Sequence, residues 1–120
     1  MNDATTTLKQ LKDQVEKLVQ EREWQQFHTP KNLSMAIAIE AAEVMEHFKW
    51  VKSDESYEEF EKHRLAIEDE VADTLITLLC FANRTNIDIS AAFARKIEEI
   101  KKKYPIEKAK GRSDKYTTYL

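Results

Sequence analysis

Residues 33–45 read LSMAIAIEAAEVM and residues 70–82 read EVADTLITLLCFA, and these two stretches decide the fold. Each is apolar nearly all round and contains neither glycine nor proline. Apolar segments of this length with acids inside them predict helices that are buried on several sides. The sequence therefore predicts an all-α protein in which these two helices are neighbours.

The scarcity of turn-forming residues supports the same fold class. The chain has 120 residues with one glycine and two prolines, whereas average usage gives roughly 8 and 6 at this length. A sandwich or barrel of many short strands needs more turns than these residues can form. The glycine-rich loops of nucleotide folds are excluded too, because one glycine cannot supply them.

Apolar spacing and capping residues predict four main helices. They cover about residues 6–22, 30–50, 64–83 and from 88 or 90 to 104, with a short charged helix in residues 57–63. Thr29 followed by Pro30 is a helix-start signal, and Pro105 ends the last helix. Short connections favour an up-and-down four-helix bundle. We predict one domain over residues 1–105, followed by a basic polar tail over residues 106–120.

The charge distribution limits the classes of partner. Residues 1–100 hold 12 Lys and Arg against 20 Asp and Glu, whereas residues 101–120 hold 7 against 2. An acidic body argues against nucleic-acid binding, while the basic tail is either solvated or a local anion-binding segment. No apolar run is long enough to span a bilayer, so we expect no membrane partner. A single cysteine, Cys80, in an apolar run and no signal-peptide pattern lead us to expect a cytoplasmic protein.

The informative feature is a set of carboxylates inside the two apolar stretches. Glu40 and Glu43 lie in the first, and Glu70 and Asp73 in the second, with i, i+3 spacing in both. This spacing places both acids of a pair on one helix face, so four carboxylates would converge between neighbouring helices. No Lys or Arg lies within residues 33–48 or 71–82 to offset them.

Burying a carboxylate without a compensating positive charge costs free energy. A divalent cation bound by the four acids would offset that cost with a single group. All the ligands are oxygen, which suits Mg²⁺ or Mn²⁺ rather than zinc. Iron is disfavoured because the Glu-x-x-His pair of di-iron bundles is absent. A single ExxE in an acidic helix is usually a solvated face, and Glu46, Glu68 and Asp69 are interpreted in that way.

Residues at the ends of the first acid-bearing helix form a second candidate group. Trp24, Phe27 and Trp50 flank it, and a tryptophan can stack on a nucleobase, although aromatic residues at helix ends more often seal a core. His28 either contacts a phosphate or sugar or caps the helix. Lys31 and Asn32 lie in its first turn, where backbone N–H groups favour anions.

Three segments together carry a family resemblance. They are residues 27–50, FHTPKNLSMAIAIEAAEVMEHFKW, residues 68–89, EDEVADTLITLLCFANRTNIDI, and residues 101–105, KKKYP. This pattern resembles the MazG-like all-α nucleoside triphosphate pyrophosphohydrolases, and within them the dCTP pyrophosphatase-like branch. The resemblance spans about residues 21–105, and KYTTYL at residues 115–120 is similar to that branch's C-terminal ending.

The resemblance implies a Mg²⁺-dependent enzyme that cleaves a (deoxy)nucleoside triphosphate, dCTP or a related or modified nucleotide, into the monophosphate and pyrophosphate. The role implied is cleaning or balancing the nucleotide pool. The fold implied is a four-helix bundle assembled as a homodimer or homotetramer, with sites between subunits.

The resemblance also implies roles for individual residues. The catalytic, metal-binding acids are Glu40, Glu43, Glu70 and Asp73, with Glu43 as the candidate general base. The nucleotide pocket is lined by Trp24, Gln25, Gln26, Phe27, His28 and Trp50, the two tryptophans holding the base. The sugar or phosphates contact His28, Lys31, Asn32 and Lys96.

Three positions depart from the family pattern. Ile100 stands where asparagine is common, Val15 where the dCTP enzymes can carry a histidine, and Thr77 where they can carry a tyrosine. These departures leave the acids intact and bear on base preference. Two alternatives remain open: a phosphoribosyl-ATP pyrophosphatase-like enzyme, and a non-catalytic helical oligomer that binds nucleotide.

Overall fold

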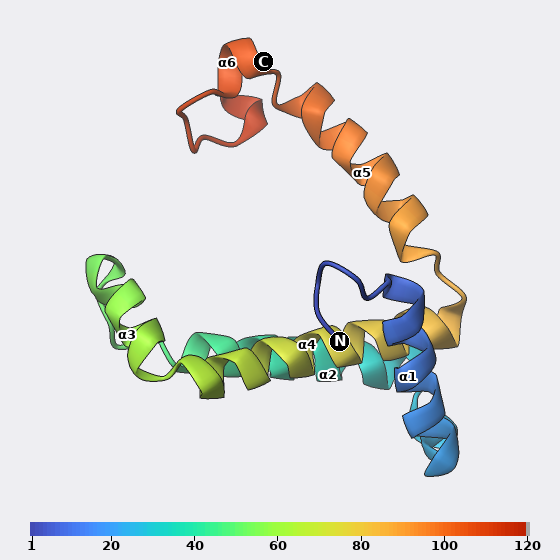
Figure 1. Cartoon of the computed structure of the whole chain (residues 1–120). Coiled ribbons are helices and arrows are strands. Elements are labelled where there is room, and N and C mark those ends of the chain that lie inside the picture. Colours follow the sequence, from blue (N-terminus) through green and yellow to red (C-terminus); the bar gives the residue numbers. More distant parts are fainter. Residues whose placement is uncertain (120) are drawn as a thin grey trace. The chain divides into compact units, whose positions relative to one another are not determined.

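The computed structural model describes residues 1–119, and within them the secondary structure is helical, without strands. The α-helices are α1 (Leu8–Glu21), α2 (Pro30–Glu46), α3 (Ser56–Lys62), α4 (Arg64–Thr85), α5 (Ile89–Lys103) and α6 (Ile106–Ala109). The 3₁₀ segments are η1 (Trp24–Phe27), η2 (Ser53–Glu55) and η3 (Tyr116–Tyr119). The chain forms two compact units, residues 1–86 and the residues from Ile87 onward (Figure 1). The all-α prediction is confirmed.

Side-chain caps begin three of the long helices. The Thr7 hydroxyl accepts from the Gln10 N–H at 3.2 Å, and the Gln10 side chain accepts from the Thr7 N–H at 2.8 Å, which completes a capping box before α1. Thr29 caps α2 with Pro30 at its first position, and Asp88 caps α5. These starts are as the sequence predicts.

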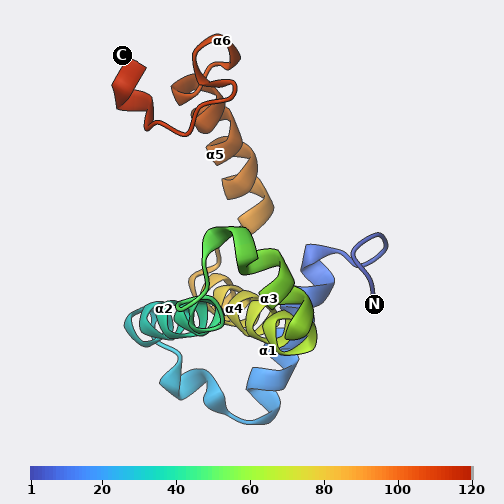
Figure 2. The same cartoon turned by 90° about the vertical axis from the view of Figure 1, so that its left-hand side faces the viewer.

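The first unit is built on the contact between α2 and α4. These two helices run antiparallel and lie side by side in both views (Figures 1 and 2), and α1 packs against α4. The buried apolar residues come mainly from α1 and α4: Val15, Val19, Leu33, Ile67, Leu79, Cys80 and Ala82. Asn83 ties the two helices further, since its side chain donates to the Lys12 carbonyl at 3.0 Å. Cys80 is buried as predicted, and burial raises the pKa of its thiol.

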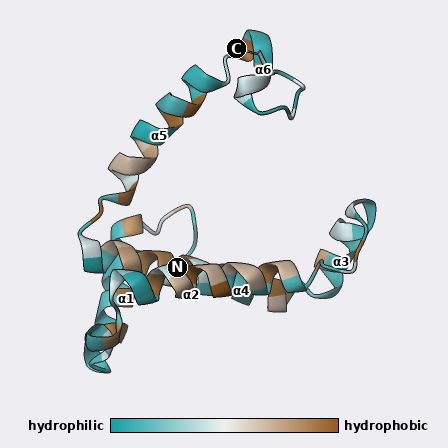
Figure 3. Cartoon of the chain, turned by 180° about the vertical axis from the view of Figure 1, so that it is seen from behind, coloured by the Kyte–Doolittle hydropathy of each residue, from teal (hydrophilic) through white to brown (hydrophobic). Residues whose placement is uncertain are grey.

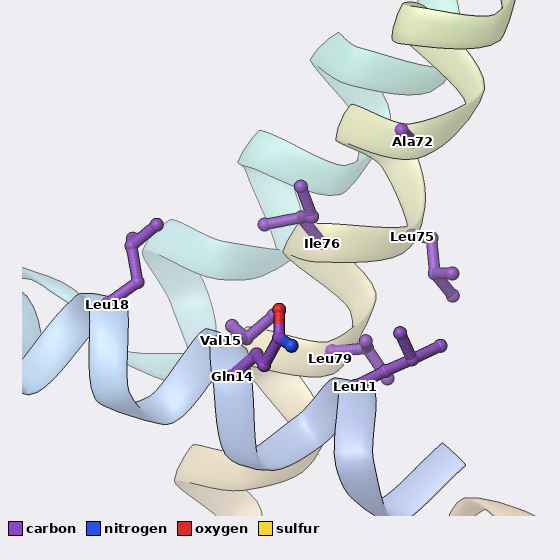
Figure 4. A pocket seen from close by; sticks show the side chains of 8 residues that line it. All are labelled: Leu11, Gln14, Val15, Leu18, Ala72, Leu75, Ile76 and Leu79. Carbon is purple, nitrogen blue, oxygen red and sulfur yellow. The ribbon is translucent and has the colours of Figure 1, made fainter. Parts of the chain in front are cut away.

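Much of the apolar surface of this unit is not covered. Large apolar residues of α2 and α4 with more than two fifths of their surface exposed are Met35, Ile39, Met45, Leu65, Val71, Leu75, Ile76 and Leu78. Figure 3 shows the hydrophobic colour along both helices. A groove of about 300 Å³ also lies between α1 and α4. Figure 4 shows its lining: Leu11, Gln14, Val15, Leu18, Ala72, Leu75, Ile76 and Leu79.

The ends of α2 and α4 differ from the prediction. The second helix ends at Glu46 rather than Trp50, because the chain tightens into i→i+3 bonds, Phe48 N–H to Met45 at 2.9 Å and Val51 N–H to Phe48 at 3.0 Å. Helix α4 continues to Thr85, where Asn86 in the left-handed conformation (φ 57°) ends it. The predicted tail contains the short helix α6.

The second unit consists of α5 and the segment that follows it. Tyr104 at the end of α5 packs edge-on against Tyr116 and Tyr119, with ring centroids 5.9 and 6.2 Å apart. Lys103 lies over the Tyr116 ring and Arg112 over the Tyr119 ring. The C-terminal segment therefore contacts the end of α5 through its aromatic rings. Within residues 1–119, no helix is both long enough and apolar enough to cross a membrane.

Candidate metal centre

The four acids singled out in the sequence lie together in the structure. Glu40 and Glu43 project from α2, and Glu70 and Asp73 from α4. One carboxylate oxygen of each residue lies within 4.8 Å of those of the other three. The arrangement follows from the i, i+3 spacing on each helix and from the antiparallel contact between the two helices. Three of the acids are partly buried and Asp73 is exposed.

The cluster is electrostatically strained. Partial burial, together with Glu43 and Asp73, raises the pKa of Glu40. The pKa of Glu70 is also raised, first by its hydrogen bond with Glu43, then by desolvation and the charges of Glu43 and Asp73. None of these influences on the two pKa values comes from a lysine or an arginine. Only His47 acts to lower the pKa of Glu70.

The donor atoms suit a hard divalent cation. All four side chains offer carboxylate oxygens, which Mg²⁺ and Mn²⁺ prefer. Glu70 Oε2 is buried and has no hydrogen-bond partner in the structure. A buried carboxylate oxygen normally has a partner, so an unpartnered one beside three further carboxylates is where a cation fits.

His47 is a neighbour of the cluster that the sequence analysis did not single out. Its Nε2 lies 3.9 Å from Glu70 Oε1, and about three quarters of each side chain is buried. His47 follows Glu43 by four residues, which places it on the same face of the chain's helical path. That spacing is the signal that could have found it.

The predicted base-binding residues lie at opposite ends of α2. Residues 24–27 form η1 beside the end of α1 (Figure 1), with Trp24 42% and Phe27 60% exposed. Trp50 follows the other end of α2 and is 90% exposed. The 17 residues of α2 give it a length of about 25 Å. Within one chain, the structure therefore does not bring the two tryptophans together.

Other predicted nucleotide contacts lie in η1, in the loop before α2 and in the first turn of α2. His28 Nδ1 is buried without a hydrogen-bond partner. The Asn32 side chain donates to the Phe27 carbonyl at 3.1 Å, so its amide holds this loop. Lys31 is exposed in the first turn of α2, and Gln26 donates to the Glu23 carbonyl at 3.0 Å. Gln25 in η1 is partly buried.

Lys96 and the departing residues fall in different places. Lys96 belongs to the second unit, where it pairs with Glu99 at 2.9 Å. Val15 is 8% exposed and belongs to the core. The Thr77 hydroxyl donates to the Thr74 carbonyl of its own helix at 2.9 Å, and Ile100 is 43% exposed on α5.

Known proteins resemble this chain in sequence and in fold. The model of the MazG-like family matches residues 35–118. The chain is 35% identical to dCTP pyrophosphatase 1 of Mus musculus and of Homo sapiens, over 81% of this chain and 58% of each relative. It therefore spans less than two thirds of the length of these relatives. A pyrophosphatase from Archaeoglobus fulgidus, solved by crystallography, is 37% identical and superposes with a TM-score of 0.80, covering 88% of this chain and 98% of that one.

The matched region includes both acid pairs, the whole of α4 and α2 from Met35 onward. The sequence agreement and the superposition thus concern the part of the molecule where the carboxylates converge. On this evidence the chain belongs to the MazG-like family, as its sequence motifs predicted.

Proposed function

We propose that this protein is a Mg²⁺-dependent nucleoside triphosphate pyrophosphohydrolase that releases pyrophosphate and the monophosphate, with dCTP or a related or modified nucleotide as substrate. The observation that carries the proposal is the cluster of four carboxylates on α2 and α4, in which neither the pKa of Glu40 nor that of Glu70 is lowered by a described lysine or arginine. The dCTP pyrophosphatases and the archaeal pyrophosphatase among its relatives support the reaction class.

The acids have two roles in this proposal. Glu40, Glu70 and Asp73 hold Mg²⁺ or Mn²⁺, which when bound supplies positive charge to the triphosphate and makes a water molecule more acidic. Glu43 both contributes to the cation site and accepts the proton of the attacking water, the role that the family resemblance implies for it. Attack by the water breaks the bond between the α and β phosphates, so that the water oxygen ends on one of the two products, the monophosphate or pyrophosphate.

The nucleotide contacts complete the proposal. The base is held by Trp24 and Trp50, with Gln25, Gln26 and Phe27 around it, and the sugar or phosphates by His28, Lys31, Asn32 and Lys96. Because Trp24 and Trp50 flank opposite ends of a helix about 25 Å long, one base contacts both only when they come from two chains. The base site therefore requires an assembly of copies.

A homodimer or homotetramer also accounts for the uncovered apolar surface. Exposed Ile39 and Met45 on α2 and Val71 and Leu78 on α4 form more apolar surface than isolated surface residues explain. In the proposed assembly α5 supplies the fourth helix of a bundle. Residues 1–105 form the catalytic domain and residues 106–120 a tail beyond it.

Pyrophosphate release from a panel of common and modified triphosphates tests the proposal. The purified chain should release pyrophosphate with Mg²⁺ and stop when EDTA removes it. Glu43→Gln and Asp73→Asn should each abolish release, whereas the exposed neighbour Glu46→Gln should not. Unchanged turnover in both Glu43→Gln and Asp73→Asn would refute the assignment of the site.

Calorimetry separates the enzyme from the alternative function. Binding of a non-hydrolysable triphosphate without turnover of any substrate would indicate a nucleotide-binding protein that is not an enzyme.

A further inference from the structure

The two oxygens of the Glu70 carboxylate have different surroundings. Oε1 lies 3.9 Å from His47 Nε2, whereas Oε2 is buried and has no hydrogen-bond partner. The contact crosses between elements, because His47 is the residue that follows the last turn of α2 and Glu70 lies in α4. The imidazole thus approaches one oxygen of the carboxylate, while the other oxygen has no hydrogen-bond partner among the described residues.

His47 has a second neighbour, His63, which leads to α3. The His63 ring lies 6.5 Å from the His47 ring between centroids, tilted by 37°. His63 Nε2 in turn lies 3.4 Å from Glu59 Oε1 of α3. Glu70, His47, His63 and Glu59 are therefore successive neighbours between the acid cluster and α3.

We propose that His47 is a positioning residue of the cation site: when the cation is bound, His47 Nε2, which lies 3.9 Å from Glu70 Oε1 in this structure, closes to donate to that oxygen and leaves Oε2 for the cation. The inference rests on the proposed function only in taking the four acids as a divalent-cation site. A carboxylate that rotates freely presents either oxygen, and a donor on one of them removes this freedom. Groups that orient metal ligands in this way typically change metal affinity by about 10- to 100-fold when removed.

The proposal is tested by measuring Mn²⁺ binding to the full chain without nucleotide. The electron paramagnetic resonance signal of free Mn²⁺ reports how much of the ion remains unbound. His47→Leu, which removes the donor, should weaken binding by about 10-fold. His47→Gln keeps an N–H donor and should recover most of the affinity. The control is Glu46→Gln, which changes an exposed charge next to His47 and should bind Mn²⁺ as the natural chain does.

A second measurement asks whether His47 acts through Glu70. In a Glu70→Gln background, His47→Leu should cause no further loss of Mn²⁺ affinity, because coupled residues are not additive. An equal loss in both backgrounds would overturn the proposal, as would equal losses for His47→Leu and His47→Gln. If His47→Leu does not fold, as judged by circular dichroism, His47→Phe replaces it and keeps a planar ring without a donor.

The outcomes separate this inference from the proposed function. Unchanged Mn²⁺ affinity in His47→Leu refutes the positioning role and leaves the enzyme assignment intact. A natural chain that binds no Mn²⁺ refutes both the cation site and the positioning role.

Discussion

Glutamates in the two units of this protein have opposite environments. On α5, Glu99 lies 2.9 Å from both Lys96 and Lys103, and these two lysines lower its pKa to about 2. Between α2 and α4, Glu40 and Glu70 lie against other carboxylates, and their pKa values are raised. The same side chain is neutralised by fixed cations in one unit and left among like charges in the other.

The two environments differ in whether a lysine on the same helix balances the negative charge of the glutamate. Lys96 and Lys103, at i−3 and i+4 on α5, balance the charge of Glu99. The residues between 33 and 48 and between 71 and 82 contain no such lysines. The four clustered acids of α2 and α4 are therefore suited to the proposed external cation, whereas Glu99 is already paired within its own helix.

The largest expected effect comes from removing a charge of the uncompensated cluster. Glu70→Gln removes a proposed cation ligand and should lower pyrophosphate release by about 100-fold or more. Glu68→Gln changes an exposed acid on the same helix and should leave release within about twofold of the natural rate. Initial rates at fixed Mg²⁺ measure both. Equal losses would show that the cluster has no special role.

Cation binding should stabilise the first unit. Because the cation offsets repulsion that exists in the folded chain, Mg²⁺ at 100 times its dissociation constant should add about 2.7 kcal/mol to the free energy of unfolding. EDTA should reverse the gain. Urea unfolding with and without Mg²⁺ measures it, and Asp73→Asn should show a smaller gain at the same Mg²⁺ concentration. A gain that is equal in both proteins would place the cation elsewhere.

The pH dependence of stability should have opposite signs in the two units. Raised pKa values mean that folded Glu40 and Glu70 hold protons more tightly than the unfolded chain, so without Mg²⁺ their contribution falls as pH rises above about 4.5. Saturating Mg²⁺ should remove this fall. The urea midpoints of the natural chain and of Glu70→Gln, measured across pH 4–8, give the contribution of Glu70 to the free energy of unfolding. If the difference between the two proteins does not change with pH, the pKa of Glu70 is not raised in the folded chain.

The smallest effect is expected at Glu99. Its lowered pKa means that its contribution is present above pH 4.5 and is lost as pH falls toward about 2. Glu99→Gln should therefore slightly destabilise the protein at pH 7, because exposed ion pairs contribute little, and the difference should vanish near pH 2. Thermal melts at the two pH values measure it. A larger destabilisation than that caused by core substitutions would show that Glu99 has a buried role in the assembled protein.

Local signals accounted for most of what was predicted correctly. Thr7, Thr29 and Asp88 begin helices because each cap depends on residues only three positions away. The acid cluster was predictable because i, i+3 spacing needs only a helix and one neighbouring helix. The end of α2 was not predictable, because the turns that follow Glu46 contain neither proline nor glycine.

The sequence by itself determined the all-α class, the helix starts and the two acid pairs, because periodicity, capping and i, i+3 spacing act over a few residues. Only the tertiary structure decided how closely the two pairs meet, within 4.8 Å, that His47 lies beside Glu70, and that Trp24 and Trp50 lie at opposite ends of α2. These facts depend on how antiparallel helices align and how long each one is. Contacts between residues far apart in the chain follow from that alignment, which no local pattern encodes.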